Sequence, residues 1–234
     1  MASRISFPGA RRRAIEEAQA AQPVCAGVAG RSNINAQFDE DGYVIVPSFI
    51  DRDLIDSTRK QITARLAQER STPEFIVGAK GTINLANLED DLPEIAARLD
   101  DPKIVQLLEM HLGPRYSRRL SYRSPQPGHG AQTLHVDWAG QVPIGRWLVA
   151  NVFIALCDID ASNGGTRVVP GSHRDFSRFQ AKSPRDRHPN EIVPRLHAGD
   201  ALIFSGHILH SGTQNTSSSE RPLLMANYQS SSET

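Results

Sequence analysis

A histidine and an aspartate two residues apart are the first feature of this chain that could do chemistry. His135 and Asp137 lie in a stretch, Gln132–Trp138, that is predicted to form a β-strand. On a strand, residues i and i+2 point to the same face, so the imidazole and the carboxylate could bind one metal ion together. The HxD spacing arises often by chance, so a third ligand must come from elsewhere in the chain.

The other histidines are the candidates for that third ligand. A structural or solvent-exposed role is expected for most of them: His111 in a predicted helix, and His129, His173, His188 and His197 in predicted turns or loops. The remaining two are His207 and His210. They are three residues apart on a predicted strand, His207–Ser211, so they would face opposite sides, and periodicity alone does not choose between them.

The residues downstream favour His210. Eleven residues after it comes Arg221, which precedes an apolar predicted strand. A guanidinium at the mouth of a barrel can hold a carboxylate through two parallel hydrogen bonds. Two histidines and one carboxylate form the facial triad of non-haem Fe(II) oxygenases, which leaves positions for a 2-oxo acid and O₂. The sequence therefore predicts Fe(II) bound by His135, Asp137 and His210, with Arg221 on the far carboxylate of 2-oxoglutarate.

The first half of the chain supplies helices. Residues 1–36 are predicted to be a partly ordered extension, with a short helix at Ala10–Ala21 and a linker at Gly27–Asn35. A short strand at Tyr43–Val46 follows a turn at Asp41-Gly42. Three further helices are predicted from apolar spacing and capping residues: Asp51–Glu69, Pro93–Leu99 and Pro102–Leu112, the last between an N-cap at Asp101 and a C-terminal cap at Gly113.

After Gly113 the pattern changes to short strands separated by Pro and Gly. The predicted strands are Ser117–Arg123, Gln132–Trp138, Trp147–Cys157, Gly165–Val169, Glu191–Pro194, Ala201–Phe204, His207–Ser211 and Leu223–Gln229. A polar loop, His173–Asn190, is long enough to cover a site. These strands predict a mainly β fold with flanking helices, built on a double-stranded β-helix or jelly-roll core like that of cupins. We expect residues 37–234 to form one domain.

The composition argues against several functions. Twenty-six basic residues balance 26 acidic ones and the sequence pI is near 7.1, so no overall field attracts nucleic acid or an anionic membrane. No apolar run reaches the roughly 20 residues that span a bilayer. Cys25 and Cys157 are too few and too far apart for a disulfide framework. We therefore expect a cytoplasmic monomer or homodimer that binds a small molecule and neither nucleic acid nor membrane.

Several stretches together resemble one family, the phytanoyl-CoA dioxygenase-like Fe(II)/2-oxoglutarate oxygenases. Pro127–Trp138 is similar to the PGxxxQxxHxDW segment of that family, and Asn163–His173 to its NGxxxxxPGSH turn. Gly199–Phe204 and Asp39–Pro47 resemble two of its strands. His210, Asn215 and Arg221 follow its HxxxxN…R spacing. The resemblance runs from about Phe38 to Gln229.

The resemblance implies a double-stranded β-helix that binds Fe(II) through His135, Asp137 and His210. It also implies that Arg221 binds the distal carboxylate of 2-oxoglutarate and that Gln132 lies near this co-substrate. One position departs from the family. Gly212 stands where members often have a small hydroxyl residue two places after the distal histidine. Ser211 or Thr213 could supply the hydroxyl instead.

The implied reaction is hydroxylation of a C–H bond with release of succinate and CO₂. Asp137 argues against halogenation, because related halogenases have Ala or Gly there so that chloride can bind the iron. Desaturation, epoxidation and rearrangement would use the same oxidant. Two rival readings are a cupin-type metalloenzyme that does not use 2-oxoglutarate and a ligand-binding jelly roll. The chain has no obvious basic groove for a CoA tail, which favours a small specialised-metabolism or amino-acid-like substrate.

Overall fold

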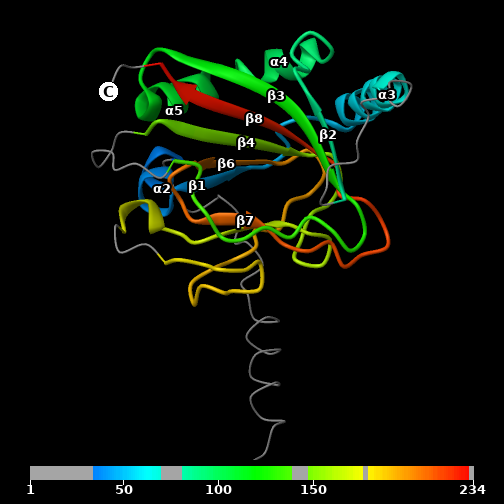
Figure 1. Cartoon of the computed structure of the whole chain (residues 1–234). Helices are drawn as coiled ribbons and strands as arrows, with labels where there is room; N and C mark the ends of the chain where they lie inside the picture. The colour runs from blue at the N-terminus through cyan, green and yellow to red at the C-terminus, as the bar shows by residue number, and fades with distance from the viewer. Residues whose placement is uncertain (1–33, 70–80, 139–146, 176–178, 232–234) are drawn as a thin grey trace, which may run out of the picture. The chain divides into compact units, whose positions relative to one another are not determined.

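The computed structural model describes residues 34–69, 81–138, 147–175 and 179–231. Residues Asn35–Thr234 form one compact unit, shown in Figure 1. The predicted helix at Ala10–Ala21 lies outside the described residues. Among the described residues, no helix has the length and apolar character needed to cross a membrane.

Two antiparallel sheets face each other in this unit (Figure 1). The larger sheet has six strands, in the spatial order β1 (Tyr43–Val46), β6 (Ala201–Ser205), β4 (Val149–Ala155), β8 (Leu223–Ser230), β3 (Tyr116–Pro125) and β2 (Thr82–Ala86). The smaller sheet pairs β5 (Thr166–Val168) with β7 (His210–Gly212). Every pairing is antiparallel. This two-layer arrangement agrees with the predicted jelly-roll core.

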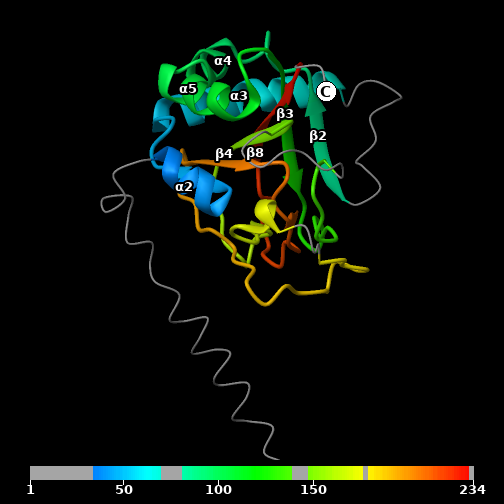
Figure 2. The ribbon, with the colours of Figure 1, turned by 90° about the vertical axis from the view of Figure 1, so that its left-hand side faces the viewer.

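Three helices cover the outer face of the larger sheet, on the side away from β7 (Figure 2). They are α3 (Arg52–Glu69), α4 (Pro93–Leu99) and α5 (Pro102–Leu112), and all three were predicted. The carboxylate of Asp101 accepts a hydrogen bond from the Lys103 N–H at 2.9 Å, which caps α5. Apolar residues of the three helices form one core cluster with the outward-facing residues of the sheet.

The two faces of the larger sheet alternate along each strand, as the pleat requires. On β4, Val152 and Ile154 belong to the cluster under the helices. Phe153 and Ala155 belong to a second cluster, which also contains Val168 of β5. We call the space between the two sheets the barrel interior. Residues whose side chains share a face with Phe153 and Ala155 therefore point into it.

Three predicted strands are wrong or misplaced. In Gln132–Trp138 only His135 makes a bridge to a neighbouring segment, because the Asp137 N–H bonds to Gly206 in a turn instead of continuing a ladder. In Glu191–Pro194 only Ile192 makes a bridge. The predicted strand His207–Ser211 is displaced to His210–Gly212, because residues 205–208 form a turn closed by the Ile208 N–H and the Ser205 carbonyl.

Two elements were not predicted. Strand β2 has the sequence TINLA, and Asn and Ala are poor strand formers, so its alternating burial gave a weak signal. Helix α2 (Ile34–Asp41) lies partly in the predicted linker and buries Phe38 alone. A polar helix with a single apolar anchor has no periodic pattern to detect. The boundary near residue 36 between extension and domain stays a prediction.

Candidate metal centre

His135 and His210 lie directly opposite each other. The His135 N–H donates to the His210 carbonyl at 3.0 Å, and the His210 N–H donates back at 2.8 Å. Residues that exchange both hydrogen bonds in an antiparallel pair project their side chains to the same face. The two imidazole rings accordingly have centroids 4.6 Å apart. One backbone pairing thus joins residues that are 75 positions apart in sequence.

The backbone also fixes which nitrogen of each ring is available. Nδ1 of His135 lies 2.7 Å from the Thr133 carbonyl, and Nδ1 of His210 lies 3.0 Å from the Ile208 carbonyl. A carbonyl oxygen only accepts hydrogen bonds, so each Nδ1 must carry the proton. Each Nε2 then keeps its lone pair for a metal ion, an arrangement that is common for metal-binding histidines.

Asp137 completes a three-residue cluster. Its Oδ1 lies 3.8 Å from Nε2 of His135 and 3.6 Å from Nε2 of His210. The potential ligand atoms of all three residues lie within 4.8 Å of one another, so one ion can reach all of them. Among the described residues, this is the only such group of three. Two imidazoles and one carboxylate match the donor set of a non-haem Fe(II) site.

Burial keeps His210 in the neutral form that a metal ion requires. Removal from water lowers the pKa of His210, and this effect outweighs the nearby Asp137 carboxylate, which acts in the opposite direction. The imidazole is buried, with 7% of its side chain exposed. A neutral imidazole binds a cation without first having to release a proton.

His207, the rival candidate, has a different role. Its Nε2 accepts a hydrogen bond from the Leu148 N–H at 3.0 Å, so that nitrogen is already occupied. It lies in the turn before β7 rather than on the strand. The prediction that His207 and His210 lie on one strand and face opposite sides was therefore wrong. His210, the histidine chosen from the sequence, is nevertheless the one that lies with His135 and Asp137.

Asn151 of β4 orients the carboxylate of Asp137. Its Nδ2 donates to Oδ2 of Asp137 at 2.7 Å, and its Oδ1 accepts from Nδ2 of Asn227 on β8 at 2.9 Å. Oδ1 of Asp137 is left facing the two histidines. Sequence reasoning missed this residue, although a buried amide inside the apolar run Trp147–Cys157 was a signal, since buried polar groups need a partner.

Asn151→Ala is expected to weaken Fe(II) binding by about 10- to 100-fold, the usual effect of removing a hydrogen bond to a metal ligand. Asn227→Ala is the matched control. It touches Asp137 only through Asn151, so a smaller loss is expected. Both affinities can be measured by anaerobic Fe(II) titration, with thermal unfolding as a check on folding. Wild-type affinity in Asn151→Ala would contradict this role.

Gln132 and Gly212 also pair between the segment that contains His135 and strand β7. The Gln132 N–H donates to the Gly212 carbonyl at 2.9 Å, and the Gly212 N–H donates to Oε1 of Gln132 at 3.0 Å. A Cβ on residue 212 would lie 2.8 Å from the Gly130 carbonyl, which explains why this position has no side chain. The hydroxyls considered as substitutes are engaged elsewhere: Ser211 accepts from Arg167 and Thr213 donates to Gly165.

Arg221 lies two residues before β8 and is 2% exposed. Its backbone N–H bonds to the Pro125 carbonyl at 3.2 Å, but its Nε and Nη1 are buried without any hydrogen-bond partner in the described structure. Burial, and secondly the neighbouring Arg123, lower the pKa of Arg221 from its ordinary value to about 10. A buried guanidinium without an anion is unfavourable, so its surroundings suit a carboxylate ligand.

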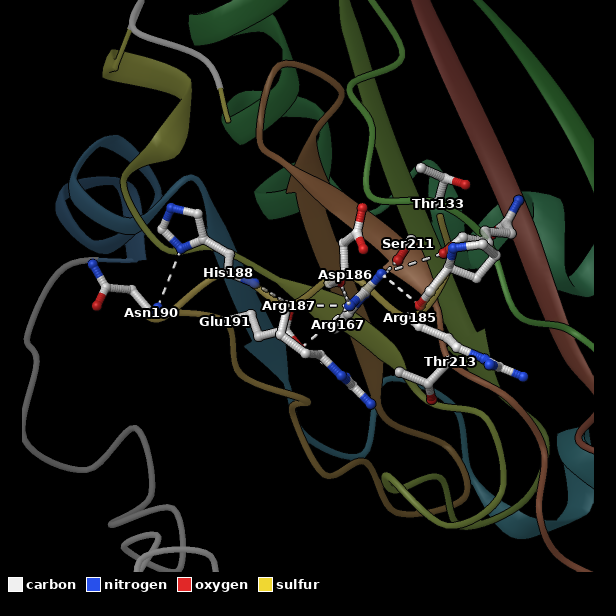
Figure 3. Close-up of polar contacts among 12 residues, drawn as sticks. Thr133, Arg167, Arg185, Asp186, Arg187, His188, Asn190, Glu191, Ser211 and Thr213 are labelled. Carbon is white, nitrogen blue, oxygen red and sulfur yellow. Dashed lines mark hydrogen bonds and ion pairs between the residues drawn. The ribbon is translucent and has the colours of Figure 1, made fainter. Parts of the chain in front are cut away.

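Arg167 of β5 ties the long loop to the metal-binding segments. Its Nε donates to Oγ of Ser211 at 2.6 Å, and its Nη1 bonds to the Asp186 carbonyl at 2.8 Å and to Oε2 of Glu191 at 3.0 Å. Figure 3 shows the guanidinium between Ser211 on one side and this part of the loop on the other. Its Nη2 reaches the carbonyls of Gln132 and Pro184, both at 3.3 Å.

Arg167→Lys is expected to destabilise the fold by about 3 kcal/mol, because one ammonium cannot replace the forked contacts of a buried guanidinium. Residues 182–191 should then exchange their amide hydrogens faster. Arg187→Ala is the matched control. Arg187 also pairs with Glu191, at 2.7 Å, but is 63% exposed, and such pairs contribute about 0–1 kcal/mol. Equal effects of the two substitutions on denaturant unfolding would contradict the central role of Arg167.

A cavity of about 330 Å³ lies on the other side of the metal-binding segment. Val136 and Trp138 line it, together with Leu209 and His207. The cavity is not lined by the candidate metal ligands His135, Asp137 and His210. These residues are sequence neighbours of the lining residues Val136, Trp138 and Leu209, so their side chains point to the other side. The cavity therefore adjoins the outer side of the smaller sheet and is separate from the barrel interior.

Three of the remaining described histidines make contacts within the fold, whereas His129 and His197 are exposed. His111 is buried and stacks on Trp147 with ring centroids 4.4 Å apart. Nε2 of His173 donates to the Asp39 carbonyl at 3.0 Å, and its ring lies against Gly42. His188 accepts at Nδ1 from the Asn190 N–H at 3.2 Å, as Figure 3 shows.

Comparisons with known proteins agree with this geometry. The family model described as Phytanoyl-CoA dioxygenase (PhyH) matches residues 38–223. The dioxygenase olcK of Penicillium canescens is 29% identical over 206 residues, which cover 78% of this chain and 65% of olcK. The Fe(II)/2-oxoglutarate-dependent dioxygenase nvfF of Aspergillus novofumigatus is 31% identical over 201 residues, covering 78% of this chain and 65% of nvfF. The chain thus spans about two thirds of the length of these relatives.

A solved structure shares the fold. The non-heme alpha ketoglutarate dependent carbocyclase SnoK from nogalamycin biosynthesis superposes with a TM-score of 0.65 at 21% sequence identity, covering 85% of this chain and 83% of SnoK. The family model covers most of the chain, including all of the residues discussed above as candidate ligands. The resemblance and the fold class predicted from the sequence are therefore confirmed. This chain belongs to the phytanoyl-CoA dioxygenase family of Fe(II)/2-oxoglutarate-dependent dioxygenases.

Proposed function

We propose that this protein hydroxylates a C–H bond of a small molecule, with conversion of 2-oxoglutarate to succinate and CO₂, and that His135, Asp137 and His210 bind its Fe(II). The observation that carries the proposal is that one fold contains both a cluster of potential metal ligands and a buried arginine that can bind an anion. Three ligand atoms converge where an ion can reach them all, and the buried guanidinium of Arg221 has no anion among the residues that the structure describes. Fe(II) fits the first and the distal carboxylate of 2-oxoglutarate fits the second.

The protein residues supply ligands, orientation and exclusion of water. His135 and His210 present neutral Nε2 atoms, because backbone carbonyls hold the protons on Nδ1. Asp137 presents one carboxylate oxygen, since Asn151 holds the other. When bound, Fe(II) with 2-oxoglutarate activates O₂ for oxidation of a C–H bond.

The barrel interior next to His210 is apolar. The Phe204 ring lies 4.8 Å from the His210 ring and 4.8 Å from the Phe153 ring, between centroids. These side chains, with Leu202 and Leu223, form a buried cluster between the two sheets. An apolar wall of this kind excludes water from a reactive centre and limits side reactions.

Asp137 disfavours halogenation as an alternative to hydroxylation. As a metal ligand, its carboxylate would take the place that a halide needs. The substrate we propose is a small molecule of specialised metabolism, for which the similarity to a carbocyclase from nogalamycin biosynthesis gives support. No large excess of basic charge is present to attract nucleic acid.

The test is turnover by the reconstituted protein. The full chain is loaded anaerobically with Fe(II) and 2-oxoglutarate, exposed to O₂, and screened against small-molecule substrates for coupled succinate formation. Products that gain one oxygen atom derived from labelled O₂ would support hydroxylation. Succinate formation coupled to the loss of two hydrogens from the substrate, without a gain of oxygen, would show that the reaction is desaturation or ring closure and not hydroxylation. Metal-dependent turnover that does not require 2-oxoglutarate would overturn the proposal.

A further inference from the structure

A second arginine faces the same part of the barrel interior as Arg221. In the pairing of β3 with β8, Arg123 lies opposite Leu223. The hydrogen bond from the Arg221 N–H to the Pro125 carbonyl continues that register by two residues. Directly opposed residues and residues two apart share a face. Arg123 and Arg221 are thus diagonal neighbours, and they share the face of Leu223, whose side chain belongs to the interior cluster.

Diagonal neighbours on adjacent strands have Cα atoms about 7–8 Å apart, within reach of long side chains. The two guanidinium groups do affect each other, because the charge of Arg123 contributes to the lowered pKa of Arg221, after burial itself. Burial also lowers the pKa of Arg123. Two positive groups therefore share one partly enclosed space.

No anion in the described structure balances them. Neither guanidinium makes an ion pair there, and Nε and Nη1 of Arg221 have no hydrogen-bond partner. The nearest carboxylate in sequence, Glu220, lies on the opposite face, where its Oε2 accepts from Oγ of Ser124 at 2.9 Å and from Nε2 of Gln126 at 3.2 Å.

The Cys157 thiol is a further ionisable group that interacts with Arg221. Burial raises the pKa of this thiol to about 11 even though Arg221 opposes the shift. At neutral pH the sulfur is protonated and uncharged, so it cannot serve as the counter-ion. No anion among the described residues thus balances this partly buried cation pair, so a bound carboxylate would stabilise it.

We propose that Arg123 binds the distal carboxylate of 2-oxoglutarate together with Arg221, a role that rests on the function proposed above. Each oxygen of that carboxylate then accepts hydrogen bonds from a guanidinium group. Such charge-assisted hydrogen bonds are stronger than those between neutral groups. Arg123 is the more exposed of the two, so it closes the outer side of the pocket while Arg221 forms its buried wall. The pair selects 2-oxo acids that have a second carboxylate.

The test compares two ligands that differ only at the distal end. Dissociation constants for 2-oxoglutarate and for 2-oxopentanoate, which has a methyl group in place of the distal carboxylate, are measured calorimetrically on anaerobic Fe(II)-loaded protein. Arg123→Gln is expected to weaken 2-oxoglutarate binding by about 10-fold or more, since a hydrogen bond to a charged group is lost. Binding of 2-oxopentanoate should change by less than about twofold. Arg123→Lys, which keeps the charge, should fall between wild type and Arg123→Gln.

Arg119→Gln is the matched control, because Arg119 lies on the same strand and the same face but is exposed. It should leave both dissociation constants unchanged. Equal weakening of both ligands by Arg123→Gln would show a merely structural effect and overturn the proposal, as would unchanged binding of 2-oxoglutarate. If wild-type protein binds neither 2-oxo acid, the proposed function itself fails, and this inference with it.

Discussion

His210→Ala is expected to abolish stoichiometric Fe(II) binding and to reduce 2-oxoglutarate turnover by at least about 100-fold, a larger effect than the loss of an outer hydrogen bond to a ligand. The physical reason is that His210 provides one of three ligand atoms, and it does so from a buried neutral imidazole whose Nδ1 proton is held by the Ile208 carbonyl. Two remaining ligands cannot hold the ion against water and buffer. Anaerobic Fe(II) titration followed by succinate measurement checks both effects.

His207→Gln is the matched control for His210→Ala. His207 lies three residues away and is similarly buried, but its Nε2 accepts the Leu148 N–H and does not face Asp137. This variant should bind one equivalent of Fe(II), even if its thermal stability falls. Loss of iron in His207→Gln at unchanged stability, with iron retained in His210→Ala, would reverse the choice between the two histidines.

Arg221→Met is expected to have opposite effects on function and on stability. Affinity for 2-oxoglutarate should fall by about 100-fold, because a buried charge-assisted pair is lost. The ligand-free protein, however, should become more stable by about 1–3 kcal/mol, since an unpaired buried charge is replaced by an apolar side chain of similar length. For a domain of this size that is a rise in Tm of about 2–4 °C per kcal/mol.

The lowered pKa of Arg221 gives the sign of the stability change. The fall of this pKa to about 10 corresponds to an unfavourable effect on the order of 3 kcal/mol in the folded state. That effect is fully present at neutral pH and is relieved only as the pH rises above the folded-state pKa of about 10. Thermal unfolding with and without 2-oxoglutarate measures both consequences. Ligand-induced stabilisation in Arg221→Met equal to that of wild type would contradict a role for Arg221 in binding 2-oxoglutarate.

The fold class and most strands could be predicted because they depend on local signals. Apolar spacing predicted α3 and α5, and the capping residues Asp101 and Gly113 marked the ends of α5 correctly. The residues Gln132–Trp138 also have strand character, but a strand requires a neighbour along its whole length. Here the segment bonds to β7 at Gln132 and at His135, and then turns away so that Asp137 bonds with Gly206 instead.

The candidate ligands could be named from the sequence, but their supporting residues could not. Residue type and spacing in the sequence indicate metal binding for His135, Asp137 and His210. Asn151 and Arg167 matter only because folding brings Asn151 to within 2.7 Å of Asp137 and places Arg167 between β7 and a loop about 20 residues farther along. Such contacts depend on strand order and register, which no local pattern encodes. The assignment of the ligands to iron stays a prediction until metal binding is measured.

The central claim is that three side chains and one buried arginine bind Fe(II) and 2-oxoglutarate at a single site. Its most direct test is an anaerobic titration of Fe(II) into the full chain with 2-oxoglutarate present, followed through the visible charge-transfer absorption of the Fe(II)–2-oxo acid chelate. We predict saturation at one Fe(II) per chain in wild type and no such absorption in His210→Ala. Absence of the absorption in folded wild-type protein, or its full retention in His210→Ala, would contradict the account.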